Sequence, residues 1–277
     1  MINKIVIGDL TISPENGYFI QSIKDLGYKT KYPVASILYL HGVKIGDLFF
    51  ENKALAVELK IGASTVADLI EKRSKIYEKL TLKEYGDDKI TIEFHLGNNL
   101  ILEAKGVVKD VNSDLAVDNL TTCDLSFTIE LEEPFLKSKQ VYEVNFGITK
   151  GGGASVPMAI PLNMTQGSSG FSLVNNGGNI FSFPEIYFYG NLTNPVLLNK
   201  TNGKSISFNQ SITSGNYIYV DTYNRIVIDN LGNNKRDKMS GDFVILEKGE
   251  NQFTLSSDVP TENGYVKLVY KYFYISI

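Results

Sequence analysis

The sequence is poor in the residues that most often carry chemistry or crosslinks. Its 277 residues include one cysteine, Cys123, two histidines, His41 and His95, and no tryptophan. A single cysteine excludes an intrachain disulfide, and the place of Cys123 on the apolar side of an alternating segment predicts a small buried side chain. With so few cysteines and histidines, we expect no metal site, no cofactor and no catalytic thiol.

An excess of positive charge and a long apolar run are also missing. The net charge of -4 and the pI near 5.4 argue against a dedicated nucleic-acid-binding protein, which is normally basic over a whole domain. No apolar segment approaches the ~18 residues of a membrane span. The first residues also lack the pattern of a signal peptide. We therefore expect no membrane insertion.

What the chain does contain indicates two β-rich domains. Its 43% hydrophobic content is enough for buried cores. Residues 1–140 hold 17 basic and 21 acidic side chains, whereas residues 141–277 hold 10 of each. Between them lie Gly151–Gly153, Pro157 and Pro161, and such a stretch does not suit a strand interior. We predict a domain over residues 1–145 and a second over 146–277.

One convincing helical period occurs, in about residues 65–80 of the first domain. Thr65 and Asp68 resemble a capping box, and Glu71 and Lys75 are spaced for a stabilising ion pair. The apolar positions recur every three or four residues and predict one buried face. They are Val66, Leu69, Ile70, Ile76, Tyr77 and Leu80.

Alternating apolar residues predict strands on both sides of this helix. Residues 90–96 and the returning segment from residue 100 flank the turn Gly97–Asn99 and predict a hairpin. Residues 121–131 alternate strictly and then stop at Glu132, Glu133 and Pro134. The segments KYPVASILYL, GDLFF and ALAVELKIG predict shorter strands.

The second domain shows no helical period and many short strands between turns, which is typical of an antiparallel sandwich or barrel. A hairpin is predicted around Asp221–Asn224, and the last strand is apolar on both faces, so we expect it to be central. The predicted strands are FSLVN, EIYFYG, PVLLN, SISFN, YIYVD, RIVID, DFVIL, NQFTL and YVKLVYKYFYISI.

None of the candidate chemical motifs is convincing. Glu132 and Glu133 are adjacent in a strand and point to opposite faces, so they indicate a solvated strand end, and Asp87–Asp88 are interpreted likewise. His95 and His41 are interpreted as surface histidines. Gly151–Ser155 lacks the Lys-Ser/Thr of a phosphate loop, and Asp229–Asp237 lacks the last acid of a calcium loop. We predict that the protein is not an enzyme.

Tyrosine is the one positive signal in the second domain. Tyrosine is amphipathic and favours interfaces and sugar faces, although tyrosines also line sandwich cores. The candidates are Tyr187, Tyr189, Tyr217, Tyr219, Tyr223, Tyr265, Tyr270, Tyr272 and Tyr274.

The order of these segments resembles the distal tail proteins of long-tailed bacteriophages and phage-tail-like particles. In the first domain the resemblance rests on ALAVELKIG, the helix with Arg73 at a usually basic position, the strands KITIEFHL and LILEAKGVV, and the ending EEPFL. In the second it rests on FSLVNNGGN, FPEIYFYGNLTNP, ISFNQSITSGNYIYVDTYNRIVID and FVILEKGENQFTL. Asn-x-Gly, Pro-x-Ile-x-x-x-Gly, aspartate-threonine after a strand and Gly-x-Asn occur there in order. Residues 147–170 depart most from the family.

The resemblance implies a mainly β structural protein of the virion. The first domain would be a β-sandwich with one packed helix, similar to tail-tube folds, and would form a hexameric ring. The second would be a galectin-like or jelly-roll antiparallel β-sandwich. The ring would form a hub between the tail tube and the tail tip or baseplate.

The resemblance also implies the partners. They are copies of the chain, the tail tube protein, a tail tip or tail-lysin-like hub protein, and receptor-binding or baseplate proteins. DNA would pass through the lumen without specific binding, which suits a slightly acidic first domain. The protein would be made in the bacterial host cytoplasm and located in the phage tail. A ring also requires that one patch fits a different patch on the next copy.

The alternative function is a carbohydrate-binding module for bacterial cell-wall sugars that uses tyrosine stacking. The sequence does not identify the sugar-binding residues, and the absence of tryptophan weakens this alternative. A hydrolase is the least favoured hypothesis.

Overall fold

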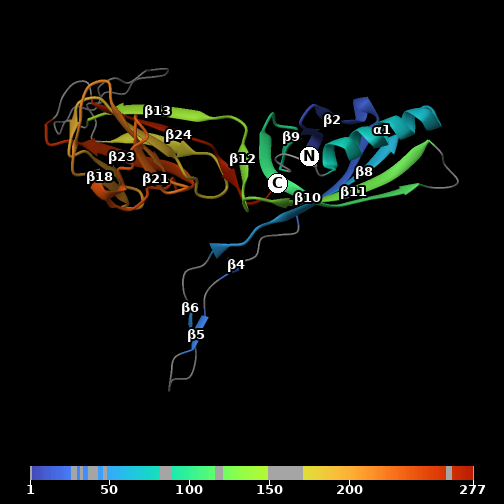
Figure 1. Ribbon diagram of the computed structural model, residues 1–277, viewed down its shortest axis with the longest axis horizontal. Helices are drawn as coiled ribbons and strands as arrows, with labels where there is room; N and C mark the ends of the chain where they lie inside the picture. Colours follow the sequence, from blue (N-terminus) through green and yellow to red (C-terminus); the bar gives the residue numbers. More distant parts are fainter. Residues whose placement is uncertain are drawn as a thin grey trace. The chain divides into compact units, whose positions relative to one another are not determined.

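A computed structural model describes residues 2–25, 30–31, 34–36, 43–45, 49–81, 89–115, 121–148, 171–259 and 264–276. The chain forms two compact units, Met1–Lys139 with Tyr274–Ile277, and Gln140–Phe273. The described residues are mainly in antiparallel strands and include one α-helix, α1 (Figure 1). This confirms the predicted fold class.

A single antiparallel sheet makes up most of the first unit. Its strand order is β2-β1-β9-β10-β11-β8-β3, and β12 pairs with the first part of β10. The bounds are β1 Ile2–Ile7, β2 Leu10–Ile12, β3 Tyr18–Asp25, β8 Ala54–Gly62, β9 Ile90–Leu96, β10 Ile101–Leu115, β11 Thr122–Leu131 and β12 Leu136–Ser138. A short 3-10 turn, Pro14–Asn16, connects β2 and β3.

The longest described strand, β10, pairs with different neighbours along its length. Residues Ile101–Gly106 pair with β9, and the rest of β10 pairs with β11. At Gly106 a Cβ atom would lie 2.4 Å from the carbonyl oxygen of Glu130, so a side chain does not fit. A register shift follows between Val108 and Asp110. A glycine next to a bulge bends a strand, which allows the sheet to curl around its core.

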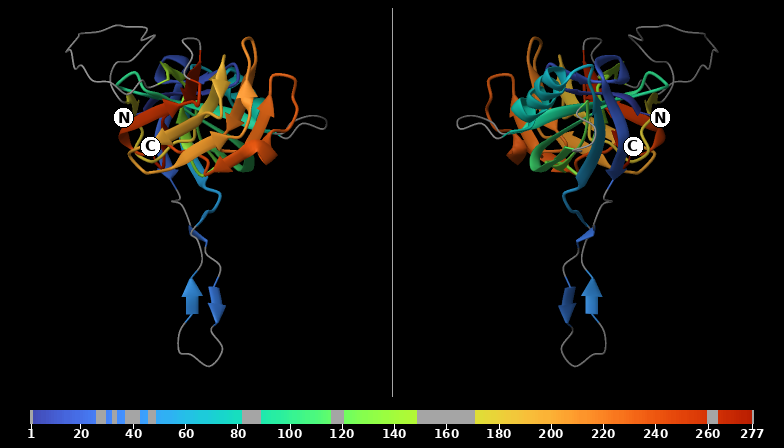
Figure 2. Two further views of the ribbon diagram at one scale, coloured as in Figure 1. Left: turned by 90° about the vertical axis from the view of Figure 1, so that its left-hand side faces the viewer. Right: turned by 90° about the vertical axis from the view of Figure 1, so that its right-hand side faces the viewer.

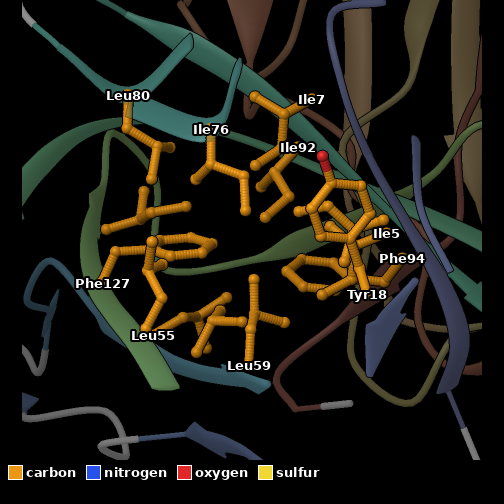
Figure 3. Packing of buried hydrophobic residues seen from close by; sticks show 14 of the residues in the cluster. Ile5, Ile7, Tyr18, Leu55, Leu59, Ile76, Leu80, Ile92, Phe94 and Phe127 are labelled. Carbon is orange, nitrogen blue, oxygen red and sulfur yellow. The ribbon is translucent and has the colours of Figure 1, made fainter. Parts of the chain in front are cut away.

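The core of the first unit lies inside this curl and beneath α1 (Val66–Leu80). Figure 3 shows Ile76 and Leu80 of the helix pointing into the same cluster as residues of β1, β3, β8, β9 and β11. The cluster includes Ile5, Ile7, Leu55, Leu59, Ile92, Phe94 and Phe127, all of them 2% exposed or less. Burial of this apolar surface is the main force that holds the sheet and the helix together.

The sequence predicts α1 well but overestimates its buried face. The Oγ1 atom of Thr65 accepts a hydrogen bond from the Asp68 amide at 3.1 Å, so Thr65 is the N-cap as predicted. The Asp68 carboxylate accepts its hydrogen bond from the Ser64 amide at 3.0 Å, one residue before the cap, so the motif differs from a strict capping box. Leu69, Ile76 and Leu80 are buried. Val66 and Ile70, however, are 44% and 60% exposed, because the core contacts a narrower stripe than the periodicity suggests.

The segment between β3 and β8 pairs with itself as a hairpin. β4 (Thr30–Lys31) pairs with β7 (Phe49–Phe50), and β5 (Val34–Ser36) pairs with β6 (Val43–Ile45). Figure 2 shows β5 and β6 as two blue arrows that run in opposite directions. The predicted strands KYPVASILYL and GDLFF are described only in these short pieces, and the rest of both lies outside the described residues.

A buried lysine links three distant positions of the first unit. Lys53 is 1% exposed and forms an ion pair with Asp25 at the end of β3. Its ammonium group also donates a hydrogen bond to the carbonyl oxygen of Ile275. The last part of the chain is therefore anchored in the unit that contains its first residues.

The second unit is a sandwich of two five-stranded antiparallel sheets. The first has the order β13-β24-β15-β20-β21, and the second β14-β23-β17-β18-β22. Phe188 of β15 contacts Phe208 of β18 with ring centroids 5.1 Å apart, which joins the two inner faces. The first sheet comprises β13 Tyr142–Gly147, β15 Glu185–Tyr189, β20 Tyr217–Asp221, β21 Ile226–Asp229 and β24 Tyr265–Tyr270. The second comprises β14 Ser172–Asn176, β17 Val196–Asn199, β18 Ser205–Phe208, β22 Met239–Gly241 and β23 Gly249–Ser256.

Small elements complete the second unit. β16 (Leu192–Thr193) pairs with β19 (Ser211–Ile212), a 3-10 turn covers Arg236–Lys238, and β25 (Phe273–Tyr274) lies where the chain returns to the first unit. The predicted hairpin β20–β21 and the central position of β24 are confirmed.

One strand prediction in this unit is wrong. Residues 242–246 contribute only an isolated bridge between Leu246 and Ser182. The chain leaves β22 at Gly241, which has a φ of +89°, and Val244 and Leu246 then fill the core without joining a ladder.

Candidate functional site

Five tyrosines share the outer face of the first sheet of the second unit. Along β15 and β20, buried residues alternate with Tyr187, Tyr189, Tyr217 and Tyr219, which therefore point away from the core. Tyr265 of β24 lies directly opposite Tyr189 and so points to the same side. These five residues are called the tyrosine face below. Tyr265 is 39% exposed, and the other four are partly buried.

The strand register arranges this face in rows across β24, β15 and β20. The first row is Tyr265, Tyr189 and Tyr217. The second row is Lys267, Tyr187 and Tyr219, and the third is Val269, Glu185 and Asp221. One side of the sheet therefore changes from wholly aromatic to partly acidic within three rows.

The rings of neighbouring tyrosines are in contact. The ring centroids of Tyr189 and Tyr265 are 5.0 Å apart with nearly parallel planes, and those of Tyr189 and Tyr217 are 5.2 Å apart. Tyr187 lies 4.9 Å from Tyr219 and 5.9 Å from Tyr189. Such contacts stabilise aromatic pairs by about 0.5–1.5 kcal/mol beyond area burial, so the rings support one another in position.

A carboxylate and an ammonium group border these rings. The Tyr187 hydroxyl donates a hydrogen bond to Oε2 of Glu185 at 3.2 Å. Burial and the negative charge of Glu185 raise the pKa of Tyr187 to about 12, and the same two causes raise the pKa of Tyr219. Lys267 forms an ion pair with Glu143 of β13 at 2.8 Å. The hydroxyls of Tyr187 and Tyr219 therefore remain protonated donors at neutral pH.

The predicted tyrosines do not all belong to this face. Tyr270 is only 6% exposed and donates a hydrogen bond to the carbonyl oxygen of Asn175 at 3.1 Å, so its predicted exposure is wrong. Tyr272 stacks on Tyr142 with centroids 4.0 Å apart. Tyr223 contacts Phe183, and Tyr274 packs against the core of the first unit. The sequence analysis missed Glu185 and Lys267, although both alternate in sequence with the tyrosines beside them.

The residues considered for catalysis lie apart from one another and serve the fold. Cys123 is buried, and burial raises the pKa of its thiol. Glu132 pairs with Lys89 at 2.7 Å and Glu133 with Lys137 at 2.6 Å, beyond the end of β11. The acidic pair therefore marks a strand end, as predicted.

His95 is partly buried rather than fully exposed at the surface. Its side chain is 20% exposed, and its Nε2 atom lies 3.5 Å from Oε2 of Glu93 on the same strand, β9. Burial, followed by the charge of Lys4, lowers the pKa of His95. His95 lines an open pocket together with Lys4, Glu15 and Asn99.

The carboxylate of Asp229 is hydrogen-bonded by its own turn. Its carboxylate accepts hydrogen bonds from the amides of Leu231 and Asn233, both at 2.9 Å. The side chain of Asn233 is the largest cause that lowers the pKa of Asp229 to about 2.

Within the described ranges, no group of three His, Cys, Asp or Glu residues could hold a metal ion. Nor does that part of the chain include a helix long and apolar enough to cross a membrane. His41, Asp87–Asp88 and Gly151–Ser155 lie outside the described residues.

A family model of known proteins matches most of the second unit. Residues 177–274 match the family model of the siphovirus-type tail component, C-terminal domain. No curated protein sequence matches the chain.

A solved structure shares the fold of this chain. The chain is similar to the Dit protein of phage SPP1, described as a paradigm of the hub adsorption apparatus in phages that infect Gram-positive bacteria. The TM-score is 0.63 at 12% identity, over 98% of each chain. A chain of the phage p2 baseplate in its activated conformation with calcium gives a TM-score of 0.42 at 14% identity, over 97% of this chain and 98% of that chain.

The predicted resemblance to phage distal tail proteins is thereby confirmed. Residues 177–274 match the family model of the siphovirus-type tail component, C-terminal domain, and the chain as a whole is similar in fold to the phage SPP1 Dit protein.

Proposed function

We propose that this protein is a structural hub of a phage tail, in which copies of the first unit form a six-fold ring. The observation that carries the proposal is the match of residues 177–274 to a siphovirus-type tail component. The ring would lie between the tail tube and the tail tip or baseplate, and DNA would pass through it without specific binding. The chain would have no enzymatic activity of its own and would be made in the host cytoplasm.

The partners and the domain roles form part of the proposal. Residues 1–145 would form the ring and bind the tail tube protein. Residues 146–277 would be a galectin-like sandwich that anchors receptor-binding, baseplate or tail tip proteins. The acidic balance of residues 1–140 supports a lumen that does not retain DNA, because basic clusters bind phosphate.

The first unit carries surfaces that suit contacts between copies. Val66 and Ile70 lie one turn apart on the exposed side of α1, and they are 44% and 60% exposed. Phe19 on β3 is 47% exposed. Among the described strands, β2 and β3 end the order of the sheet and offer edges. In a ring, such a patch packs on a different patch of the next copy.

The test measures assembly of the full chain by light scattering over a range of concentrations, with class-averaged electron micrographs. We expect six-fold particles, and we expect Val66→Asp with Ile70→Asp to give monomers of unchanged thermal stability, because both side chains are already exposed. The matched control is Leu231→Asp, which changes a 79% exposed leucine of the second unit and leaves assembly intact.

A protein that remains monomeric at high concentration, even with the tail tube protein of the same particle present, would refute the ring. Rings that form equally well with both α1 changes would show that another surface makes the contact.

A further inference from the structure

We propose that the tyrosine face is a binding platform for an uncharged glycan. This goes beyond the hub function, because a ring-forming protein does not require an aromatic sheet face on its second unit. The platform consists of the first row, Tyr265, Tyr189 and Tyr217, and the adjoining pair Tyr187 and Tyr219.

The first row has the length and the aromatic surface to bind a short saccharide. Its three tyrosines come from neighbouring strands, so the row extends over about 10 Å of a regular sheet. The C–H faces of sugar rings pack on aromatic side chains, and tyrosine adds a polar tip to an apolar body. Contacts of 5.0 and 5.2 Å between neighbouring rings hold the row in one arrangement before any ligand arrives. Such preorganisation reduces the entropy lost on binding.

The hydrogen-bonding groups beside the rings also suit a sugar. Within the described part of the chain, the hydroxyls of Tyr189, Tyr217 and Tyr265 bond to no protein group, and so they are available to a ligand. Glu185 lies two rows away and already accepts a hydrogen bond from Tyr187. A carboxylate and several hydroxyl donors next to aromatic rings can orient a polyhydroxylated ligand.

Charge decides between classes of ligand. The outward positions of the sheet include Glu143, Glu185 and Asp221, against one ammonium group, Lys267, which is paired with Glu143. This excess of negative charge disfavours phosphate-rich polymers and nucleic acids. The centre of a protein interface is usually depleted of charged residues, whereas Glu185 and Lys267 lie within this face. An uncharged glycan satisfies both conditions.

The binding test uses the full chain and uncharged oligosaccharides of N-acetylglucosamine, glucose, galactose and rhamnose, with a poly(glycerol phosphate) teichoic acid as the anionic probe. Ligand-observed NMR measures binding. Because the chain has 16 tyrosines and no tryptophan, tyrosine fluorescence of the wild-type chain provides a second readout that is not specific to the site. We expect saturable binding of at least one neutral oligosaccharide. Tyr189→Ala and Tyr217→Ala should each weaken this binding by about tenfold or more.

The matched control is Tyr272→Ala, which removes a stacked tyrosine of the same unit outside the face and leaves binding unchanged. Thermal melting of each variant establishes that it is folded. The pair Val66→Asp with Ile70→Asp should retain glycan binding, so failure of the ring and failure of the platform are separable.

Three results would overturn the proposal. One is the absence of binding tighter than about 1 mM for every neutral probe. Another is binding of the teichoic acid alone. The third is loss of binding to a tail or receptor-binding protein in the tyrosine variants while wild type binds no glycan, because the face would then be a protein interface.

Discussion

At the scale of single residues, burial and the nearby carboxylate of Glu185 together set how Tyr187 and Tyr219 respond to pH. Burial and the charge of Glu185 raise the pKa of Tyr187 from 10.0 to about 12 and also raise the pKa of Tyr219. An unfolded tyrosine loses its proton above about pH 10. Between pH 10 and pH 12 the unfolded chain therefore binds fewer protons than the folded chain. The free energy of unfolding must fall as the pH rises through this window.

We predict that Glu185→Gln makes this loss of stability smaller, because it removes the charge but leaves the burial. The measurement is the urea midpoint at about pH 9 and at about pH 11, together with titration of tyrosinate absorbance. Asp242→Asn is the control, because it also removes one negative charge. The Asp242 side chain is 70% exposed, and its ion pair with Lys204, at 3.8 Å, is long. Equal pH dependence in wild type and Glu185→Gln would show that Glu185 does not influence these tyrosines.

The sequence predicts the outward tyrosines but not their arrangement. Alternation within EIYFY and YIYVD indicates that Tyr187 and Tyr217 leave the core. The rows depend on the pairing of β15 with β20 and β24, which are far apart in sequence. Local pattern carries no information on that register. Local pattern also does not show that Tyr270 is buried, because its burial depends on the partner sheet.

Buried asparagines account for two of the short motifs in the second unit. Asn251 of the Gly-x-Asn motif donates to the carbonyl oxygens of Glu247 and Gly249 and accepts from the Glu247 amide at 2.8 Å. Asn176 of the Asn-x-Gly motif accepts from the Gly178 amide at 3.0 Å. Unpaired buried polar groups cost about 1–3 kcal/mol each, so these side chains fix the loops. The sequence reveals these motifs, but it does not reveal which backbone groups their asparagine side chains bind.

At the scale of elements, β10 depends on Gly106. A Cβ atom there would meet the Glu130 carbonyl oxygen at 2.4 Å and Cγ2 of Ile129 at 2.8 Å. Both belong to β11, the next strand in the sheet. The position therefore tolerates no side chain unless β10 and β11 separate.

We predict that Gly106→Ala destabilises the first unit by about 2–3 kcal/mol through this overlap. Gly147→Ala is the matched control, because its Cβ would meet only the Gly264 carbonyl oxygen at 3.7 Å. Chemical denaturation of both variants gives the difference. Equal stability of the two would mean that β10 can move away from β11 without loss.

Helix α1 shows what periodicity can and cannot predict. Its start, its end at Leu80 and its buried Leu69 and Ile76 follow from the sequence pattern. The width of the buried stripe depends on how the curled sheet meets the helix, and sequence spacing does not fix it. Val66 and Ile70 lie beyond that stripe and are available for a partner.

At the scale of the whole molecule, the first unit is closed by residues from both ends of the chain. Lys53 has a fully buried side chain, pairs with Asp25 and donates to the carbonyl oxygen of Ile275. Removal of one member of a buried ion pair leaves the other charge without compensation. We therefore expect the largest loss of stability when only one of the two charged groups is removed.

We predict that Asp25→Asn destabilises the protein by about 3 kcal/mol, because the Lys53 ammonium group stays buried. The double variant Asp25→Asn with Lys53→Met should recover most of this loss, since no buried charge remains. Urea denaturation of the two single variants and the double variant completes the cycle. Additive effects of the two changes would show that Asp25 and Lys53 are not coupled.

The return of Tyr274–Ile277 to the first unit makes Gln140–Phe273 an insertion within that unit. Exchanging this module for the corresponding module of a related chain therefore requires two junctions, at Lys139/Gln140 and Phe273/Tyr274. A chimera spliced only after Lys139 would leave Lys53 without the Ile275 carbonyl oxygen. Grafts that keep both splice points should yield soluble chimeras, and grafts with a single splice point should not.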